Sequence, residues 1–337
     1  MIAFKNGTHI HLHPALIKAY TALRKSRLVL WIKFLVIGAC IYVLHSRLNA
    51  FDFRPDFLYK YPDLGKILFF FLLLAGINFF LDVYLWAIIS GGKRKNRLRL
   101  SHYARHHLIS MSLGFITPNN LGEYGGKMRQ FNAPTSKIKG FLLAFHFRTV
   151  KTVARNLIGL AAVIWLYTTD RLPYLTTWQI GLLALFVSVY ALFYVFLEDL
   201  LPLISSFSIQ GKNYFQLFLR IRFSLIQKTK WTLVSSIKFL IYVVQLTLLL
   251  KVSEQDIGLL ELMANVCFYY SLASYLPTIL AFDPIVKGAA GILMLRHLGL
   301  NDWIVLTSVT MVWVTNVAFP SIVGSFLWLR KKKPTHL

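Results

Sequence analysis

Residues Ser112–Arg129 read SLGFITPNNLGEYGGKMR and lie between hydrophobic stretches, yet they contain features that a lipid-exposed helix avoids. Pro118 has no backbone donor and disfavours helix at Thr117, and the asparagines and glycine that follow favour a turn. We therefore expect one helix to end near Thr117 and another to begin near Leu121. Inside a bilayer, such a broken backbone is tolerated only where protein buries it or where it lines a water-filled cavity.

Two interpretations of this turn remain open. In the first, it is the tip of a re-entrant hairpin whose second arm directs free amides and the positive end of its dipole at an anionic group. In the second, it is an ordinary cytoplasmic turn between two amphipathic helices, because such residues are also common in loops. The residues at the tip are Pro118, Asn119, Asn120, Gly122 and Glu123.

The composition predicts a membrane protein built only of helices. The chain has 337 residues, of which 56% are hydrophobic, and a mean hydropathy of +0.58. Several segments reach the ~20 apolar residues that span a hydrocarbon core of about 30 Å. The segments between them are too short for a soluble catalytic module, so residues 1–337 are expected to form one polytopic membrane domain.

The net charge of +24 is concentrated in clusters that flank the spans. Such clusters indicate the cytoplasmic side of the membrane and attract anionic lipid. This pattern places both termini in the cytoplasm and the chain in a bacterial inner membrane. Nucleic acid is not an expected partner, since no recognisable binding module accompanies the charge. The clusters are Lys18–Arg27, Lys93–Arg99, Lys212–Lys230 and Arg330–Lys333.

Neither a metal site nor another cofactor is expected. Two cysteines lie in apolar stretches, which does not indicate a disulfide framework. Three alternating histidines near the N-terminus lack a neighbouring cysteine or carboxylate, so we favour an interfacial helix within residues 1–27 over metal binding. No cleavable signal is expected, since the apolar run from Leu28 reads as an uncleaved first span. These side chains are Cys40, Cys267, His9, His11 and His13.

Charged residues inside the apolar spans are candidates for function. Asp82 follows Asn78 by one helical turn on the same face. Arg148, Lys151 and Arg155 also share a helical face and predict a cationic track for a phosphate-bearing headgroup. The alternative is that these cations extend to the interface or pair with acidic groups.

Counting the sides of the membrane predicts two halves of opposite orientation. Residues 66–167 and 231–329 each read as a span, an interrupted segment and a second span. The interrupted segments, 98–137 and 257–300, then enter from opposite faces. Inverted repeats with interrupted helices are the architecture of alternating-access transporters. In the second of these segments the interruption is expected over Leu276–Lys287, and two short spans remain an alternative to a re-entrant hairpin for residues 257–300. The last span is expected to be broken at Asn316 and Pro320.

The first turn resembles a signature of a known family. Pro118, Leu121, Gly122 and Glu123 are similar to the Pro-x-x-x-Gly-Glu turn in the transmembrane flippase domain of lysylphosphatidylglycerol synthases and their stand-alone relatives. Pro277–Ala290 resembles the second signature, but it departs from the expected Gly-Gly-x-Gly and Arg-Glu pattern. The resemblance implies lipid translocation between leaflets, with aminoacylated phosphatidylglycerol as the best-known cargo, and a form without the soluble transfer domain.

The leading hypothesis is therefore a flippase for a lipid with a polar, phosphate-bearing or aminoacylated headgroup. Its expected partners are membrane lipids with an anionic or zwitterionic headgroup, and a homodimer is one assembly that the sequence leaves open. An integral-membrane enzyme is the first alternative, although no catalytic constellation is evident; its chemistry would come from His102, His106, His107 and Glu123. A scaffold that binds anionic lipid through its basic loops is the second. The expected substrate-binding residues are Pro118, Asn119, Asn120, Gly122, Glu123, Lys127, Arg129, Arg148, Lys151, Arg155, Asp82, Asp283 and Lys287.

Overall fold

The computed structural model describes residues 27–48, 64–91, 100–115, 117, 120–131, 134–172, 175–199, 222–252 and 256–329. All regular secondary structure within these ranges is helical. As the composition predicts, five of the described helices are long and apolar enough to cross a membrane. They are Gly65–Ser90, Lys139–Thr168, Thr177–Val195, Leu225–Lys251 and Asp302–Leu329.

Some of the sequence predictions fall outside the described residues. They include Pro118 and Asn119 of the first turn, the three N-terminal histidines, and the basic clusters at 93–99 and 330–333. The expected first span forms helix α2 (Arg27–Leu48), within which Phe34–Ser46 is a shorter apolar stretch.

The first half of the chain contains the expected interruption. Helix α4 ends at Phe115 and helix α5 begins at Leu121. Asn120 adopts a left-handed backbone conformation with φ 57°, which a helix cannot continue through. The Thr117 hydroxyl then accepts a hydrogen bond from the Gly122 N–H at 2.7 Å. The predicted helix break is thus confirmed, and the helices of this half are α3 (Leu64–Ser90), α4 (Leu100–Phe115), α5 (Leu121–Met128) and α6 (Pro134–Thr168).

The second interruption is shorter than the sequence indicated. We expected Leu276–Lys287 to be broken throughout, but Asp283 and Pro284 form the first turn of α12. Proline is accepted there because the first helical N–H has no partner within the helix. The helices from the middle of the chain onward are α7 (Thr177–Val195), α10 (Leu225–Lys251), α11 (Leu259–Ala273), η3 (Leu280–Phe282), α12 (Asp283–Leu295) and η4 (Arg296–Leu298).

The last span contains a π-helical turn. Helix α13 (Asp302–Trp313) passes into η5 (Val314–Ala318), a π-helix, and continues as α14 (Phe319–Leu329). The sequence placed a break at Asn316 and Pro320, and the irregular turn indeed contains Asn316. Short π-helical turns inside α-helices often occur at functional sites.

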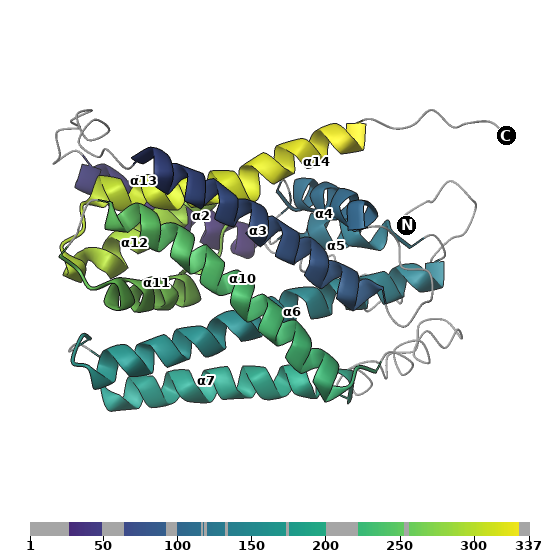
Figure 1. Cartoon of the computed structure of the whole chain (residues 1–337), viewed down its shortest axis with the longest axis horizontal. Helices are drawn as coiled ribbons and strands as arrows, with labels where there is room; N and C mark the ends of the chain where they lie inside the picture. Colours follow the sequence, from purple (N-terminus) through teal and green to yellow (C-terminus); the bar gives the residue numbers. More distant parts are fainter. Residues whose placement is uncertain are drawn as a thin grey trace.

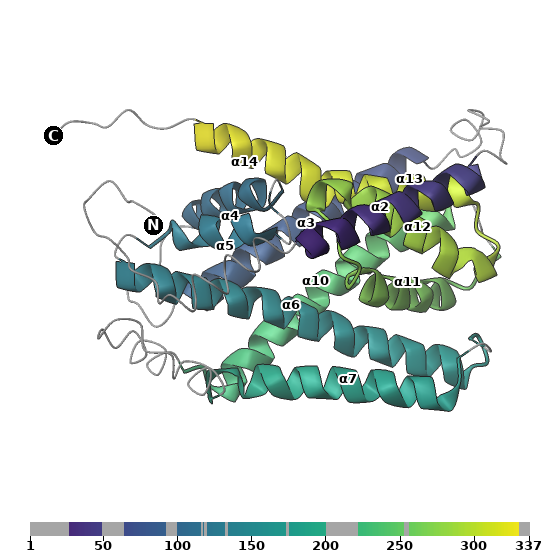
Figure 2. The ribbon, with the colours of Figure 1, turned by 180° about the vertical axis from the view of Figure 1, so that it is seen from behind.

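The two interrupted segments lie toward opposite ends of the helix bundle (Figures 1 and 2). Helices α4 and α5 lie at the end where α3 finishes and α6 begins, and α11 and α12 lie at the other end. Helix α4 packs against α14, and α11 packs against α6. Helices α3 and α10 pack against each other and run in opposite directions through the bundle.

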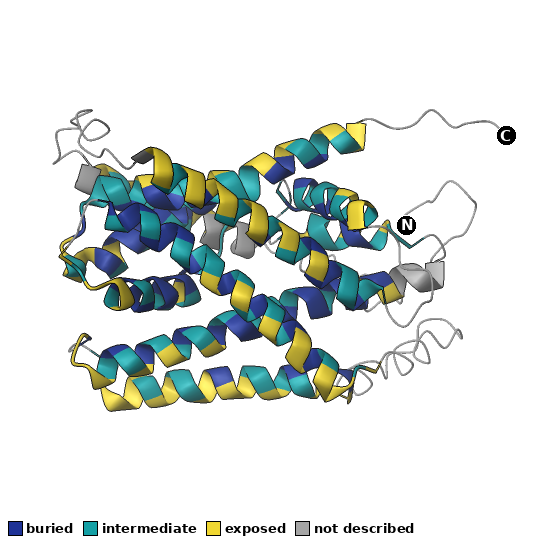
Figure 3. Ribbon diagram, viewed as in Figure 1, coloured by how far each residue is buried: buried dark blue, intermediate teal, exposed yellow. Residues whose placement is uncertain are grey.

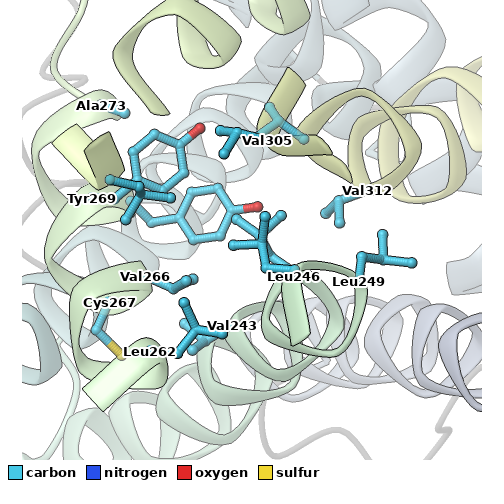
Figure 4. Close-up of a cluster of buried hydrophobic side chains, with 14 of the residues drawn as sticks. Val243, Leu246, Leu249, Leu262, Val266, Cys267, Tyr269, Ala273, Val305 and Val312 are labelled. Atoms are coloured by element: carbon cyan, nitrogen blue, oxygen red, sulfur yellow. The ribbon is translucent and has the colours of Figure 1, made fainter. Parts of the chain in front are cut away.

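Apolar packing holds the second half together, and apolar side chains also cover the outside. Side chains from α10, α11 and α13, among them Val243, Val266 and Val312, form a buried cluster (Figure 4). Outward-facing surfaces carry exposed residues along α3 and α7 (Figure 3). Phe69 and Leu185 on these helices are more than 60% exposed. Such an apolar exterior is what a hydrocarbon environment favours.

Two glycines allow close packing against α4. A Cβ at Gly126 of α5 would lie 2.5 Å from Ser110 Cα, and a Cβ at Gly324 of α14 would lie 2.0 Å from the Leu108 carbonyl oxygen. Only glycine permits these approaches. The hairpin α4–α5 and the end of the last span are therefore fixed against each other.

Candidate functional site

A polar cavity of about 180 Å³ lies where the two halves meet. Both interruptions reach it, since Asn120 from the first and Leu280 from the second contribute to its wall. Further lining residues come from α3, α4, α5, α6, α10 and η5. The described lining consists of Asn78, Phe79, Asp82, His107, Met111, Gly114, Asn120, Glu123, Lys151, Lys238, Tyr242, Leu280, Asn316 and Val317.

Asp82 is the centre of the charges in this cavity. Its carboxylate lies 3.2 Å from Lys238 Nζ and 3.5 Å from Lys151 Nζ. The carboxylate therefore holds two ammonium groups that come from different helices, α10 and α6. Asn78, one turn earlier on α3, lines the same cavity, which agrees with the shared face that the spacing indicates.

Glu123 and Lys127 form a second ion pair on α5. Lys127 Nζ donates to Glu123 Oε1 at 2.5 Å. Lys127 is fully buried, and its ammonium lies 4.0 Å from the centroid of the Phe147 ring and 5.2 Å from that of Trp86. Glu123 lines the cavity and Lys127 does not. Lys127 therefore acts on the cavity through Glu123, whose carboxylate it holds by a hydrogen bond.

The protonation of the hairpin residues follows from these contacts. Burial, together with the Lys127 ammonium, lowers the pKa of His107 to about 3, so the imidazole is neutral. Its contact with Asp82 at 3.9 Å is therefore not a full ion pair. Burial raises the pKa of Glu123, but the Lys127 and Lys151 ammonium groups and the hydrogen bond from Lys127 together outweigh burial and bring that pKa to about 2. The groups lining the cavity are thus two carboxylates and two ammonium groups, and Lys127 behind them makes the cluster net positive.

A chain of amides joins the halves beside these charges. Asn78 Nδ2 donates to Asn316 Oδ1 at 2.5 Å, and Asn316 Nδ2 donates to Gln245 Oε1 at 3.1 Å. Gln245 Nε2 in turn donates to the Phe71 carbonyl oxygen at 3.1 Å. Because these groups are largely buried, each hydrogen bond removed would leave a polar atom without its partner.

The three cations of the expected track do not have a common environment. Only Lys151 lines the cavity. The Arg148 guanidinium lies 5.9 Å from the Tyr124 ring centroid, and that of Arg155 lies 6.0 Å from the Tyr275 ring centroid. The three residues share one face of α6, but Arg148 and Arg155 are about 10 Å apart along the helix axis. Different parts of the chain therefore pack against them: α5 lies beside Arg148, and the segment just after α11 lies beside Arg155.

Four other described sequence candidates do not line the cavity: Gly122, Arg129, Asp283 and Lys287. Lys287 Nζ donates to Asp283 Oδ2 at 2.5 Å, and Tyr269 donates its hydroxyl to the Lys287 carbonyl oxygen at 2.8 Å. This pair organises the start of α12, next to η3. Arg129 follows α5 and is exposed. Gly122 begins α5 against the Thr117 hydroxyl.

Sequence reasoning missed Lys238, Tyr242 and Asn316 as lining residues. Lys238 lies midway along the apolar span Leu225–Lys251, where a cation is itself a signal for function. Asn316 was noticed only as a helix break. Within the described part of the chain, no three His, Cys, Asp or Glu side chains gather as a metal site would require.

Comparison with models of known protein families gave no match, and comparison with curated proteins gave none either. The resemblance to the flippase domain therefore rests on the residues of the two turns alone.

Proposed function

We propose that the protein is a lipid translocase that moves a lipid with an anionic, phosphate-bearing headgroup between the two leaflets. The observation that carries this proposal is the polar cavity between apolar helices, in which Lys151 and Lys238 share the Asp82 carboxylate. Two ammonium groups placed around one carboxylate also suit a phosphate, which can replace the carboxylate as their partner.

The charge balance supports an anionic substrate. Burying an ammonium group in an apolar surrounding is costly unless it is paired. Among the described residues, the cluster contains one ammonium more than it has carboxylates, so an entering phosphate would compensate the excess positive charge of these groups.

The cavity volume limits the headgroup. About 180 Å³ corresponds to roughly six waters at ~30 Å³ each. A glycerophosphate or a phosphate with a small substituent is of this size. An oligosaccharide is far larger and would require extensive opening.

The helix packing supports an inverted repeat made of α3–α6 and α10–α14. The hairpin of each half packs against the last span of the other half, as α4 does on α14 and α11 does on α6. A two-fold axis in the membrane plane that relates the two halves would place each hairpin against the last span of the other half. The same axis would make α3 and α10 antiparallel neighbours. In our proposal, α4–α5 and α11–α12 are re-entrant hairpins that open the cavity to one leaflet at a time.

Lipid exchange in proteoliposomes tests the proposal. Purified protein is reconstituted with a trace of phosphatidylglycerol that carries a fluorescent label on one acyl chain, and dithionite then bleaches the label that reaches the outer leaflet. Wild-type protein is expected to expose inner-leaflet label faster than protein-free liposomes do. Lys238→Ala is expected to slow this exchange by about tenfold or more, because a charge-assisted hydrogen bond contributes about 1.5–3 kcal/mol.

Lys230→Ala is the matched control, since Lys230 lies on the same helix and is exposed. It is expected to exchange lipid at the wild-type rate. Exchange no faster than in protein-free liposomes would remove the translocase proposal. Equal rates for wild type and Lys238→Ala would remove the cavity from the mechanism.

A further inference from the structure

A second group of cations lies one helical turn beyond the cavity along α6. Arg155 follows Lys151 by four residues, which is about 6 Å further along the helix axis. Lys287 lies in the second turn of α12. Neither Arg155 nor Lys287 lines the cavity, yet the two lie close enough for their charges to act on each other. The first half of the chain therefore contributes one cation to this group and the second half contributes the other.

The Arg155 guanidinium has an unused donor. Among the described residues, no acceptor forms a hydrogen bond with its Nε atom, which is buried. Asp283, the carboxylate of this group, is held by Lys287 at 2.5 Å. A buried donor without an acceptor is costly in an apolar surrounding. An anion that supplies oxygen atoms beside Arg155 would remove this cost.

The Tyr275 hydroxyl lies beside the same guanidinium. The Arg155 guanidinium is 6.0 Å from the Tyr275 ring centroid. The hydroxyl oxygen accepts a hydrogen bond from Asn156 Nδ2 at 2.5 Å, so its own proton can be donated to another acceptor. Tyr275 is 46% exposed, which leaves this group accessible from outside the protein.

The acid–lysine pair of the second hairpin repeats that of the first, with the accessible member exchanged. Lys127 follows Glu123 by four residues on α5, and Lys287 follows Asp283 by four on α12. In the first pair, the carboxylate side chain is 18% exposed and the lysine 1%. In the second pair, the lysine is 24% exposed and the carboxylate 4%. The second hairpin therefore presents an ammonium group where the first presents a carboxylate.

Two residues of the cavity wall connect the cavity with this second group. Tyr242 lines the cavity and also interacts electrostatically with Asp283 and Lys287. Leu280 lines the cavity as well, and it precedes Asp283 by only three residues. Tyr242 and Leu280 therefore stand between the two groups of charges.

We propose that Arg155, Lys287 and the Tyr275 hydroxyl form a second site for the phosphate of the lipid headgroup. This inference rests on the proposed function and adds a second position of the headgroup between the two leaflets. A phosphate that crosses an apolar core needs compensating charge at each depth, because burying an unpaired anion is costly. It passes from Lys151 to Arg155 along one face of α6 when Tyr242 and Leu280 move aside.

Titration calorimetry with glycerophosphate tests the second site. The Lys238→Ala variant, whose cavity has lost one ammonium group, is expected to keep measurable binding at the second site. Adding Arg155→Gln to this variant is expected to weaken that binding about tenfold or more, because contacts between arginine and phosphate are charge-assisted. Adding Arg155→Lys keeps the positive charge and is expected to weaken it less. Lys139→Gln is the matched control, since Lys139 is exposed on the same helix, and it should leave binding unchanged.

Tyr275→Phe provides a milder test in the same Lys238→Ala background. It keeps the ring at an exposed position and removes only the hydroxyl, so the fold should be retained. The lost hydrogen bond is expected to weaken glycerophosphate binding about 2–10-fold. This variant decides the question even if Arg155→Gln does not fold. In lipid exchange, Arg155→Gln alone is expected to be about tenfold slower than wild type, and Lys139→Gln is expected to match wild type.

The outcomes separate this inference from the proposed function. Glycerophosphate binding that depends on Arg155, without lipid exchange by the wild type, would support the second site and remove the translocase. Wild-type lipid exchange combined with unchanged binding in both the Arg155→Gln and Tyr275→Phe variants would overturn the second site and leave the translocase in place. A complete loss of glycerophosphate binding in Lys238→Ala alone would also overturn it, because the cavity would then be the only anion site.

Discussion

Replacing Asp82 by asparagine tests whether its carboxylate occupies the place of a phosphate. Asp82 lies within 3.5 Å of both Lys151 and Lys238. Asparagine keeps the size of the side chain and removes its charge. The groups that line the cavity would then be two ammonium groups and one carboxylate, that of Glu123.

The size of the effect follows from the geometry. A phosphate that contacts both lysines would lie about 5 Å from the Asp82 carboxylate, where two unit charges interact by about 3 kcal/mol at an effective dielectric constant of about 20. Water and counter-ions in the cavity reduce this repulsion. With about 1.5–3 kcal/mol remaining, Asp82→Asn should bind glycerophosphate about 10–100-fold more tightly than wild type.

Titration calorimetry of the purified protein with glycerophosphate measures this change. Lipid exchange by the same variant is expected to slow, since a tightly held headgroup leaves slowly. Without anion, Asp82→Asn should also unfold at a lower temperature, because Lys151 and Lys238 lose the carboxylate that they share. Added glycerophosphate should restore much of that loss by mass action.

Asp256→Asn serves as the control because Asp256 is exposed, and it should leave binding unchanged. Unchanged or weaker glycerophosphate binding by Asp82→Asn would refute the reasoning. Asp82 would then be only a structural partner of the lysines, and any anion would bind elsewhere.

Three further predictions concern stability, each measured as thermal unfolding of the purified protein in detergent. Gly126→Ala should lower the unfolding temperature, because its Cβ would lie 2.5 Å from a backbone atom of α4. Gly125→Ala is the control and should not lower it, because no atom lies within 4 Å of the Cβ added there. Equal effects of the two variants would contradict the packing argument. Asn316→Leu should destabilise by about 1–3 kcal/mol, because its amide partners are left unpaired; an unchanged unfolding temperature would show that the amide chain is dispensable. Lys228→Met should cost about 3–5 kcal/mol by leaving buried Glu198 without its cation, and the double variant with Glu198→Gln should recover part of that loss. No recovery in the double variant would mean that Lys228 acts through its bonds to α7 carbonyls instead.

Local sequence signals predicted the helices and their interruptions well. The proline-asparagine turn before Leu121 and the proline pair around Asp283 marked breaks because backbone preferences act over a few residues. The lengths of the apolar stretches likewise predicted the candidate spans, since hydrocarbon thickness sets the number of residues required. The start of α12 was misplaced because proline is accepted in the first turn of a helix as readily as in a loop.

The sequence by itself determined which charged groups lie within apolar surroundings, among them Asp82 and Lys151. Only the tertiary structure decided which of them meet. Asn78 and Asn316 are 238 positions apart, and Lys238 joins Asp82 from another helix. Likewise, Arg155 shares a helical face with Lys151 yet lies beside Tyr275. The physical reason is that helical periodicity fixes only the direction of a side chain on its own helix. The partner of that side chain depends on where other helices cross it. Close contacts at glycines such as Gly324, distant in sequence from α4, help to set those crossings.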